Sequence, residues 1–310
     1  MKGTARGKVI LFGEHAVVYG VPAIAVGIAR GAEATAAAID AGPSRLNLGG
    51  LDVEADASGQ DLSRALAAIV EATGVRVPML VEARADLPPG GGLGCSAALG
   101  VAIARALDPH ADDHAVVERA MAWERVFHGN PSGIDAAVAA TGGCVLFERG
   151  RPIQPVVVTA PLTLCVGHSG TASSTKTMVE SVARLRERRR DLVDKTFEGI
   201  RSLAGNARLA IEAGDLRAVG RLLDLNQMLL AGLFLSTPEI EHMCALARDA
   251  GALGAKVTGA GGGGSVIALV GGAAAGVDVL AAWRAAGFDG FVTEVAEGRR
   301  RVAASVEPNP

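Results

Sequence analysis

The strongest local constraint in this chain is a run of glycines that ends where an alanine-rich segment begins. Gly90 to Gly94 contains four glycines and one leucine, and it follows Leu87-Pro88-Pro89. That tripeptide is expected to be extended, because a residue that precedes proline avoids the helical region. The segment from Ser96 to Leu107 is rich in alanine, which predicts a helix. A glycine loop therefore leads directly into a helix N-terminus.

Such a loop is a candidate phosphate-binding site. Its backbone N–H groups can converge on one point, and the helix dipole adds positive potential there. Glycine suits the loop because a Cβ would hold a phosphate away from the backbone. A flexible turn that merely caps the helix explains the same residues equally well. The chain carries no G-x-x-x-x-G-K-[ST] motif, so it is not a P-loop NTPase. The candidate phosphate-binding residues are Pro89, Gly90, Gly91, Gly92, Leu93, Gly94, Cys95, Ser96 and Ala97.

A second glycine run, Gly259 to Gly264, formally matches G-x-G-x-x-G. A dinucleotide-binding fingerprint needs a helix after this motif, whereas the strand-like sequence SVIALV follows here. We therefore expect a glycine loop that packs against another loop.

Two carboxylates flank a sharp break in the chain. A predicted helix from 113 to 127 carries Glu124 and stops at His128-Gly129-Asn130-Pro131. Ser132 is a suitable N-cap for a second helix through Ala139, which carries Asp135. This arrangement can bring both acids into one cleft, where phosphoryl transfer needs one for Mg²⁺ and one for the alcohol proton. Spacing alone equally fits two exposed acids on separate helices.

Lys8 begins a short apolar strand, predicted over 8–12, and Glu14 and His15 follow that strand. A lysine in this position is usually a solvated strand end, and a loop histidine is usually an ordinary hydrogen-bonding residue.

Composition indicates a globular α+β chain of two domains. Its 310 residues exceed what one core usually fills, and 49% of them are hydrophobic. We expect domains at 1–155 and 156–310, because prolines lie among valines and threonines near 150–160. Further helices are predicted at 61–73, 175–194, 196–213, 216–233 and 238–250, and strands at 21–30, 255–258, 265–270 and 291–295.

Charge and aromatic content exclude several partners. The net charge is -3 and aromatics make up 3%, which argues against nucleic acid and anionic membranes as partners. No apolar run approaches the roughly 20 residues of a membrane span. The four cysteines are scattered, as in a cytoplasmic protein with reduced thiols.

The order of these motifs resembles the GHMP family of small-molecule kinases, and the resemblance covers the chain from Lys8 to Ala268. Three blocks carry it: KVILFGEHAVVYG from Lys8, PPGGGLGCSAA from Pro88 and KVTGAGGGG from Lys256. The block ERVFHGNPSGID from Glu124, together with GEHAVVYG, is similar to the mevalonate kinases within that family. The resemblance implies a two-domain fold, with an N-terminal α/β domain like that of a ribosomal protein and a ferredoxin-like α+β domain after it.

The resemblance also implies a role for each matching residue. Residues 89–97 would wrap the phosphates of ATP, Ser96 and Glu124 would hold Mg²⁺, and Asp135 would be the base on the substrate hydroxyl. Lys8 would lie beside Asp135 as a second catalytic residue. The residues implied to line the substrate pocket are Glu14, His15, Asp135 and Thr175. Gly259, Ala260, Gly261 and Gly262 are implied to brace the phosphate loop.

The implied ligands are ATP, Mg²⁺ and mevalonate, and the resemblance leaves a homodimer possible. Cys95 stands where the family usually has serine, while Ser96 is retained. Phosphomevalonate kinase, homoserine kinase and a catalytically inactive ligand sensor of the same fold remain as alternatives. The sensor would be expected to lack Lys8, Glu124 or Asp135, and this chain has all three.

Overall fold

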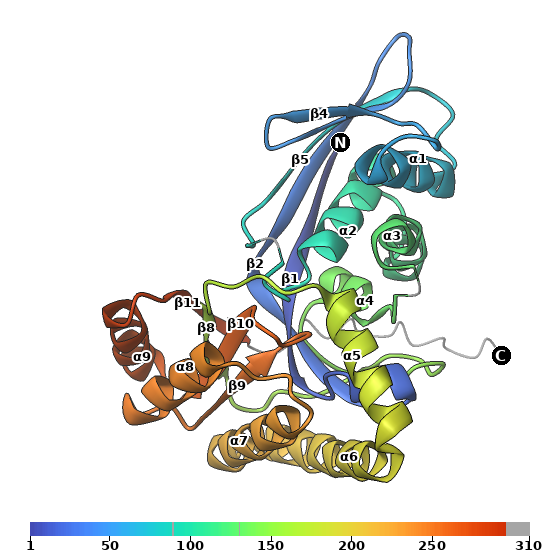
Figure 1. Cartoon of the computed structure of the whole chain (residues 1–310). Coiled ribbons are helices and arrows are strands. Elements are labelled where there is room, and N and C mark those ends of the chain that lie inside the picture. The colour runs from blue at the N-terminus through green and yellow to red at the C-terminus, as the bar shows by residue number, and fades with distance from the viewer. Residues whose placement is uncertain (89, 130, 296–310) are drawn as a thin grey trace, which may run out of the picture.

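The computed structural model describes residues 1–88, 90–129 and 131–295. Their helices and strands alternate irregularly and form two sheets, each with its own helices (Figure 1). This is an α+β fold of two domains, as the sequence predicted.

The first sheet is built around one long antiparallel pair, β1 (Lys2–Phe12) and β2 (Ala23–Ala38). The remaining strands follow the order β4-β3-β5-β2-β6-β7 within the described chain. Four helices lie together on one side of the β1–β2 pair (Figure 1). The other elements of this domain are β3 (Arg45–Leu48), β4 (Leu51–Glu54), β5 (Met79–Ala85), β6 (Cys144–Phe147), β7 (Gln154–Pro155), the short 3₁₀ helix Ala16–Tyr19, α1 (Asp61–Thr73), α2 (Cys95–Leu107), α3 (Asp113–His128) and α4 (Ile134–Thr141).

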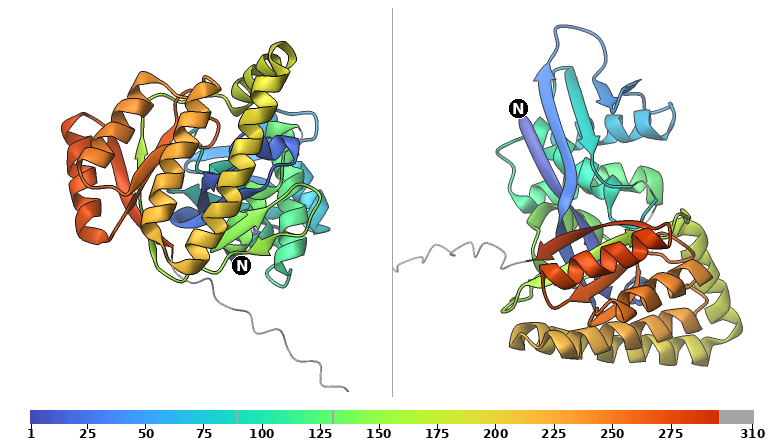
Figure 2. Two further views of the ribbon diagram at one scale, coloured as in Figure 1. Left: turned by 90° about the horizontal axis from the view of Figure 1, so that it is seen from below. Right: turned by 90° about the vertical axis from the view of Figure 1, so that its left-hand side faces the viewer.

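The second sheet is antiparallel, with the order β11-β8-β10-β9. Helices α8 and α9 pack against it, and α6 and α7 run side by side along one end of the molecule (Figure 2). Its elements are β8 (Leu162–His168), α5 (Thr175–Arg188), α6 (Arg190–Ala213), α7 (Leu216–Gly232), α8 (Pro238–Asp249), β9 (Gly254–Thr258), β10 (Ser265–Val270), α9 (Ala273–Ala285) and β11 (Asp289–Val295). We propose the domain boundary after residue 155, between β7 and β8.

Small side chains build the core and allow close approach between elements. Every residue of α2 from Ala97 to Ala104 is buried. Gly100 lies against the buried ring of Trp123, where an added Cβ would be 3.0 Å from Trp123 Cδ1. This contact holds α3 close to α2 and so fixes the helix that carries Glu124.

Two predicted helix boundaries were wrong. Helix α4 begins at Ile134 and is capped by Gly133, whose φ of 88° favours glycine, rather than by Ser132. Ser132 nevertheless accepts a hydrogen bond from the Ile134 N–H at 3.4 Å. The break between α5 and α6 lies at Arg189, not near residue 195. The run of charged residues there has no apolar period that could mark the break.

Several elements were not predicted from the sequence, among them the β3–β4 hairpin, β8 and α9. No helix in the described part of the chain is long and apolar enough to cross a membrane.

Candidate active site

A cavity of about 230 Å³ lies between the two domains and contains most of the predicted site residues. It is lined by β1, the glycine loop, the first turns of α2 and α4, the buried face of α3, and the loop after β9. The predicted residues that line it are Lys8, Glu14, His15, Gly90, Gly91, Gly92, Leu93, Gly94, Cys95, Ser96, Ala97, Glu124, Asp135, Thr175, Gly259 and Ala260. Gly261 and Gly262 follow directly in the same loop, and Pro89 lies outside the described residues.

The glycine loop ends at Gly94, which caps α2 in the left-handed conformation with φ 74°. A Cβ on Gly94 would lie 2.9 Å from Cγ of Lys8, so glycine is required here both by conformation and by space. The first N–H groups of α2 have no intrahelical acceptor, and they face the cavity together with the loop. The arrangement can bind an anion.

The second glycine loop packs against the first. The Ser265 hydroxyl donates a hydrogen bond of 2.7 Å to the Gly91 carbonyl. A Cβ on Gly259 would lie 3.1 Å from the Cα of Gly92. The structure thus brings the two glycine runs together, and at Gly92 and Gly259 their backbones are in direct contact.

Ser96 and Glu124 meet at the cavity wall. The Ser96 hydroxyl donates to a Glu124 carboxylate oxygen at 2.5 Å, and Trp123 Nε1 donates to the same hydroxyl at 3.3 Å. Burial raises the pKa of Glu124 to about 7. The negative charge of Asp135 contributes to this rise, whereas the Ser96 hydrogen bond and the Lys8 charge oppose it. A cation bound beside this buried carboxylate would favour its ionised form and so displace the proton.

Lys8 and Asp135 form an ion pair of 3.1 Å between Nζ and Oδ1. Lys8 is almost fully buried in β1, and its Nζ also donates to the Gly92 carbonyl at 3.1 Å. Asp135 lies in the first turn of α4, and 36% of its side chain is exposed to the cavity and solvent. A charged amine and an accessible carboxylate therefore adjoin the glycine loop.

Glu14 and His15 lie in the turn after β1, and both side chains are already engaged. Glu14 forms an ion pair with Lys256 and accepts a hydrogen bond of 3.2 Å from Asn226 Nδ2. His15 Nε2 lies 2.7 Å from the Ala260 carbonyl, to which it donates. Burial lowers the pKa of His15, and the bond to Ala260 partly offsets this effect. The two residues line the cavity, but their polar atoms point into the second domain.

Thr175 begins α5 and lines the cavity from the second domain. The segment before it is tied to the glycine loop after β9, because the Ser173 hydroxyl donates to the Gly261 carbonyl at 2.6 Å. Ser174 caps the helix by accepting from the Thr177 N–H at 3.4 Å.

Sequence reasoning missed three residues at the site. His128 lines the cavity, with Nε2 3.8 Å from a Glu124 carboxylate oxygen, and burial lowers its pKa. Lys256 and Asn226 are fully buried behind Glu14. The polar pair Asn226-Gln227 interrupts the apolar stretch LLDLNQMLL, and this was the signal that could have identified Asn226.

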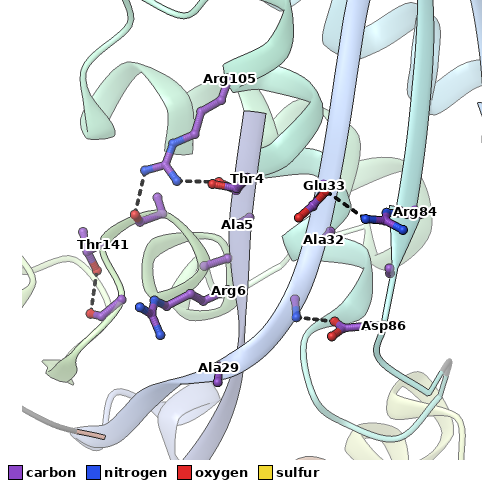
Figure 3. A pocket seen from close by; sticks show the side chains of 15 residues that line it. Thr4, Ala5, Arg6, Ala29, Ala32, Glu33, Arg84, Asp86, Arg105 and Thr141 are labelled. Atoms are coloured by element: carbon purple, nitrogen blue, oxygen red, sulfur yellow. Dashed lines mark hydrogen bonds and ion pairs between the residues drawn. The ribbon is translucent and has the colours of Figure 1, made fainter. Parts of the chain in front are cut away.

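A wider cavity of about 620 Å³ lies apart from this site, between β1, β2, the end of β5 and the C-terminus of α4 (Figure 3). Two arginine side chains that line this cavity already have polar partners. Arg84 contacts Glu33 at 3.2 Å, and Arg105 donates to the carbonyls of Thr4 and Ala140 at 2.7 Å each. Its lining residues include neither glycine loop. This wider cavity therefore lacks the loop backbone that could bind phosphates.

The described residues contain no group of three or more His, Cys, Asp or Glu side chains placed to hold a metal ion. A cation at Ser96 and Glu124 would therefore take its remaining ligands from substrate phosphates and water. Mg²⁺ is commonly bound in this way, through one or two carboxylates and the substrate phosphates.

Comparison with known proteins shows which family has this architecture. The model of the GHMP kinase N-terminal domain matches residues 61–143, and that of the GHMP kinase C-terminal domain matches residues 207–289. The mevalonate kinase of Methanothermobacter thermautotrophicus is 34% identical over 86% of this chain and 88% of its own length. The mevalonate kinase of Archaeoglobus fulgidus is 35% identical over 87% of this chain and 92% of its own.

Solved structures agree. The crystal structure of L. major mevalonate kinase in complex with R-mevalonate has a TM-score of 0.84, with 27% identity and 96% of each chain covered. The mevalonate kinase of Methanococcus jannaschii shares the fold at a TM-score of 0.82, with 22% identity over 96% of this chain and 98% of its own. The chain belongs to the GHMP kinase family, whose members use ATP.

Proposed function

We propose that this chain transfers the γ-phosphoryl group of ATP to (R)-mevalonate, giving 5-phosphomevalonate and ADP. The observation that carries the proposal is the Lys8–Asp135 ion pair of 3.1 Å, which adjoins the glycine loop inside the interdomain cavity. Support for the substrate comes from relatives named as mevalonate kinases that match this chain over most of its length, and from the L. major enzyme solved with R-mevalonate.

The glycine loop would bind the triphosphate of ATP. Its backbone and the α2 N-terminus supply N–H donors and a positive dipole end, and the absence of side chains lets phosphates approach closely. Ser265, at the start of β10, would help to keep this shape, because its hydroxyl is bonded to the Gly91 carbonyl. Positioning of this kind accounts for much of the catalysis in phosphoryl transfer.

Asp135 would accept the proton of the attacking hydroxyl. Its carboxylate is accessible from the cavity, as a general base must be, and it can reach a substrate only if the alcohol lies beside Lys8. Lys8 would hold the Asp135 carboxylate in place through their ion pair and stabilise negative charge on the alcohol oxygen.

Ser96 and Glu124 would hold Mg²⁺. Both present oxygen atoms, which are the ligands that Mg²⁺ prefers, and they lie at the helix N-terminus where the phosphates would bind. The ion supplies positive charge to the phosphate oxygens when bound. Glu14, His15 and Thr175 would form the alcohol side of the cavity, Glu14 and His15 through their backbone and apolar atoms more than through free polar groups.

The test is ADP release from ATP and Mg²⁺ with mevalonate, phosphomevalonate, homoserine and galactose in parallel. We expect mevalonate to give the highest kcat/KM. Preference for phosphomevalonate or homoserine would replace the proposed substrate and leave the family assignment intact. Binding of ATP and mevalonate without turnover would support the inactive sensor instead.

A further inference from the structure

A fully buried ion pair joins the two domains directly behind the active-site cavity. Glu14 belongs to the turn after β1, and Lys256 is the central residue of β9. Neither side chain is exposed to solvent. Lys256 Nζ also donates to the Val257 carbonyl at 2.5 Å, and Asn226 Nδ2 donates to the second Glu14 oxygen at 3.2 Å. Each charge therefore has several partners in a site without water access.

The turn that carries Glu14 has a strained backbone conformation, which needs contacts with the rest of the protein to be stable. His15 has φ 59° and ψ -46°, in a region that non-glycine residues rarely occupy. Such strain persists only where surrounding contacts hold it. The turn has backbone bonds of its own, such as that from the Val17 N–H to the Gly13 carbonyl at 3.0 Å. The second domain adds the Glu14–Lys256 pair and the bond of 2.7 Å from His15 to the Ala260 carbonyl.

The same turn is coupled to the catalytic strand. It directly follows β1, which carries Lys8, and β1 is tied to β9 through Ile10. The Ile10 N–H donates to Thr258 Oγ1 at 2.9 Å, and that hydroxyl donates back to the Ile10 carbonyl at 3.0 Å. These bonds align β1 with the edge of β9, whereas Lys256 supplies the charge that pairs with the carboxylate of the turn, beside the neutral donor Asn226.

We propose that Lys256 is a positioning residue for phosphoryl transfer, which holds the Gly13–Ala16 turn so that it forms the alcohol side of the cavity. The inference rests on the proposed kinase function and assigns a role to a residue that does not line the cavity. Lys256 acts through Glu14 and does not touch the reacting atoms.

A paired substitution can separate positioning from stability. Lys256→Met strands the Glu14 carboxylate in a dry site, which destabilises the fold strongly whatever the role of Lys256. Lys256→Met/Glu14→Gln removes both charges at similar volume, and such neutral replacements of buried pairs are often tolerated. The double variant therefore folds while lacking the ionic contact. Lys195→Met, which removes an exposed lysine on α6, is the matched control.

We expect the double variant to keep the melting temperature and the ATP KM close to wild type. Its KM for mevalonate should rise about tenfold or more, because small misplacement of substrate-positioning groups is costly. Amide hydrogen exchange of residues 13–18 should accelerate in the double variant and not in Lys195→Met. A mevalonate KM within about twofold of wild type, with unchanged exchange, would overturn the inference.

The outcomes for the two proposals are distinguishable. If the wild-type chain phosphorylated none of the four alcohols, the proposed function would fail, and with it the claim that Lys256 serves transfer. Exchange at residues 13–18 would still decide whether Lys256 holds the turn. If wild type turned over mevalonate and the double variant matched it, only the positioning role would fail.

Discussion

Asp135 and Lys8 are the residues on which the proposed chemistry depends. A primary alcohol is a poor nucleophile, and its proton must leave as the O–P bond forms. Asp135 is the accessible carboxylate in contact with Lys8, whereas Glu124 is buried and bonded to Ser96. The two acids that flank the 128–131 turn thus occupy different environments, and these suit a base and a metal ligand respectively.

Asp135→Asn keeps the shape of the side chain and removes the base. We expect kcat to fall by at least about a hundredfold, the lower limit of general-base assistance. Nucleotide affinity measured by calorimetry should hardly change, because the phosphate donors lie in the glycine loop. Asp61→Asn, also in the first turn of a helix, is the control. An Asp135→Asn enzyme with more than about a tenth of wild-type kcat would show that another group takes the proton.

Glu124 should make the Mg²⁺ requirement depend on pH. With a pKa of about 7, its carboxyl is mostly protonated at pH 6 and mostly ionised at pH 8. The Mg²⁺ concentration for half-maximal rate should therefore fall by up to about tenfold between these pH values, because only the ionised form binds the cation. Glu124→Gln and Ser96→Ala should each raise the requirement, while Glu118→Gln on the same helix should not. A requirement that is flat with pH in wild type and unchanged in both variants would remove these residues from the metal site.

The same pKa predicts an effect on stability. Folding raises the pKa of Glu124 from 4.5 to about 7, so the native state binds a proton that the unfolded state releases between these values. The free energy of unfolding should therefore decline as pH rises from about 4.5 to 7, by up to about 3 kcal/mol for this buried group. The Glu124→Gln variant has no carboxyl to ionise, so its free energy of unfolding should not decline in this way. Without Mg²⁺, the melting temperature of the variant should therefore rise relative to that of wild type as pH increases. A difference between the two that does not vary with pH would contradict the assignment.

Cys95 opens α2 beside the glycine loop, and its thiol is half-buried. Burial, aided by the charges of Asp86 and Glu124, raises its pKa, so little thiolate exists at neutral pH. Cys95→Ser should change kcat by less than about twofold, because the loop acts through backbone N–H groups. Steady-state kinetics provide the check. A large loss would mean that the thiol contacts a substrate.

At the scale of elements, the junction between the glycine loop and α2 determines the site. Gly94 has φ 74°, and a Cβ there would meet Lys8. Gly94→Ala should therefore lower both ATP affinity and kcat, with strain of about 1–3 kcal/mol at this residue. Gly205→Ala in α6 is the matched control, because a Cβ there meets nothing within 4 Å. It should stabilise the protein by about 0.5–1 kcal/mol without affecting rate. Wild-type kinetics in Gly94→Ala would contradict the loop assignment.

The sequence predicted those helices and strands that are determined by apolar spacing and capping residues within a short segment. Helix α1 occupies 61–73 as predicted, and Gly74 caps its end in the left-handed conformation. The start of α4 was displaced because either Ser132 or Gly133 can cap a helix, and only the backbone conformation decides between them. Strand β8 and helix α9 lacked a clear apolar period, so tertiary contacts rather than local pattern define them.

At the scale of the whole molecule, the active site exists only where two distant parts of the chain meet. The Ser96–Glu124 contact spans 28 residues, and the resemblance to the GHMP family placed both residues at one Mg²⁺ site. The Glu14–Lys256 pair spans 242 residues, and the sequence around either residue does not indicate its partner. For this reason the sequence predicted most of the residues that line the cavity but not the buried pair behind them.

The central claim is transfer of a phosphoryl group from ATP to mevalonate, and phosphorus NMR of the reaction mixture tests it most directly. With the purified chain, ATP, Mg²⁺ and (R)-mevalonate, we predict one new phosphomonoester signal coupled to the C5 methylene protons, equal in amount to the ADP formed. Asp135→Asn should form it at least about a hundredfold more slowly. ADP with free phosphate and no phosphomonoester, or a phosphomonoester on a different hydroxyl, would contradict the account.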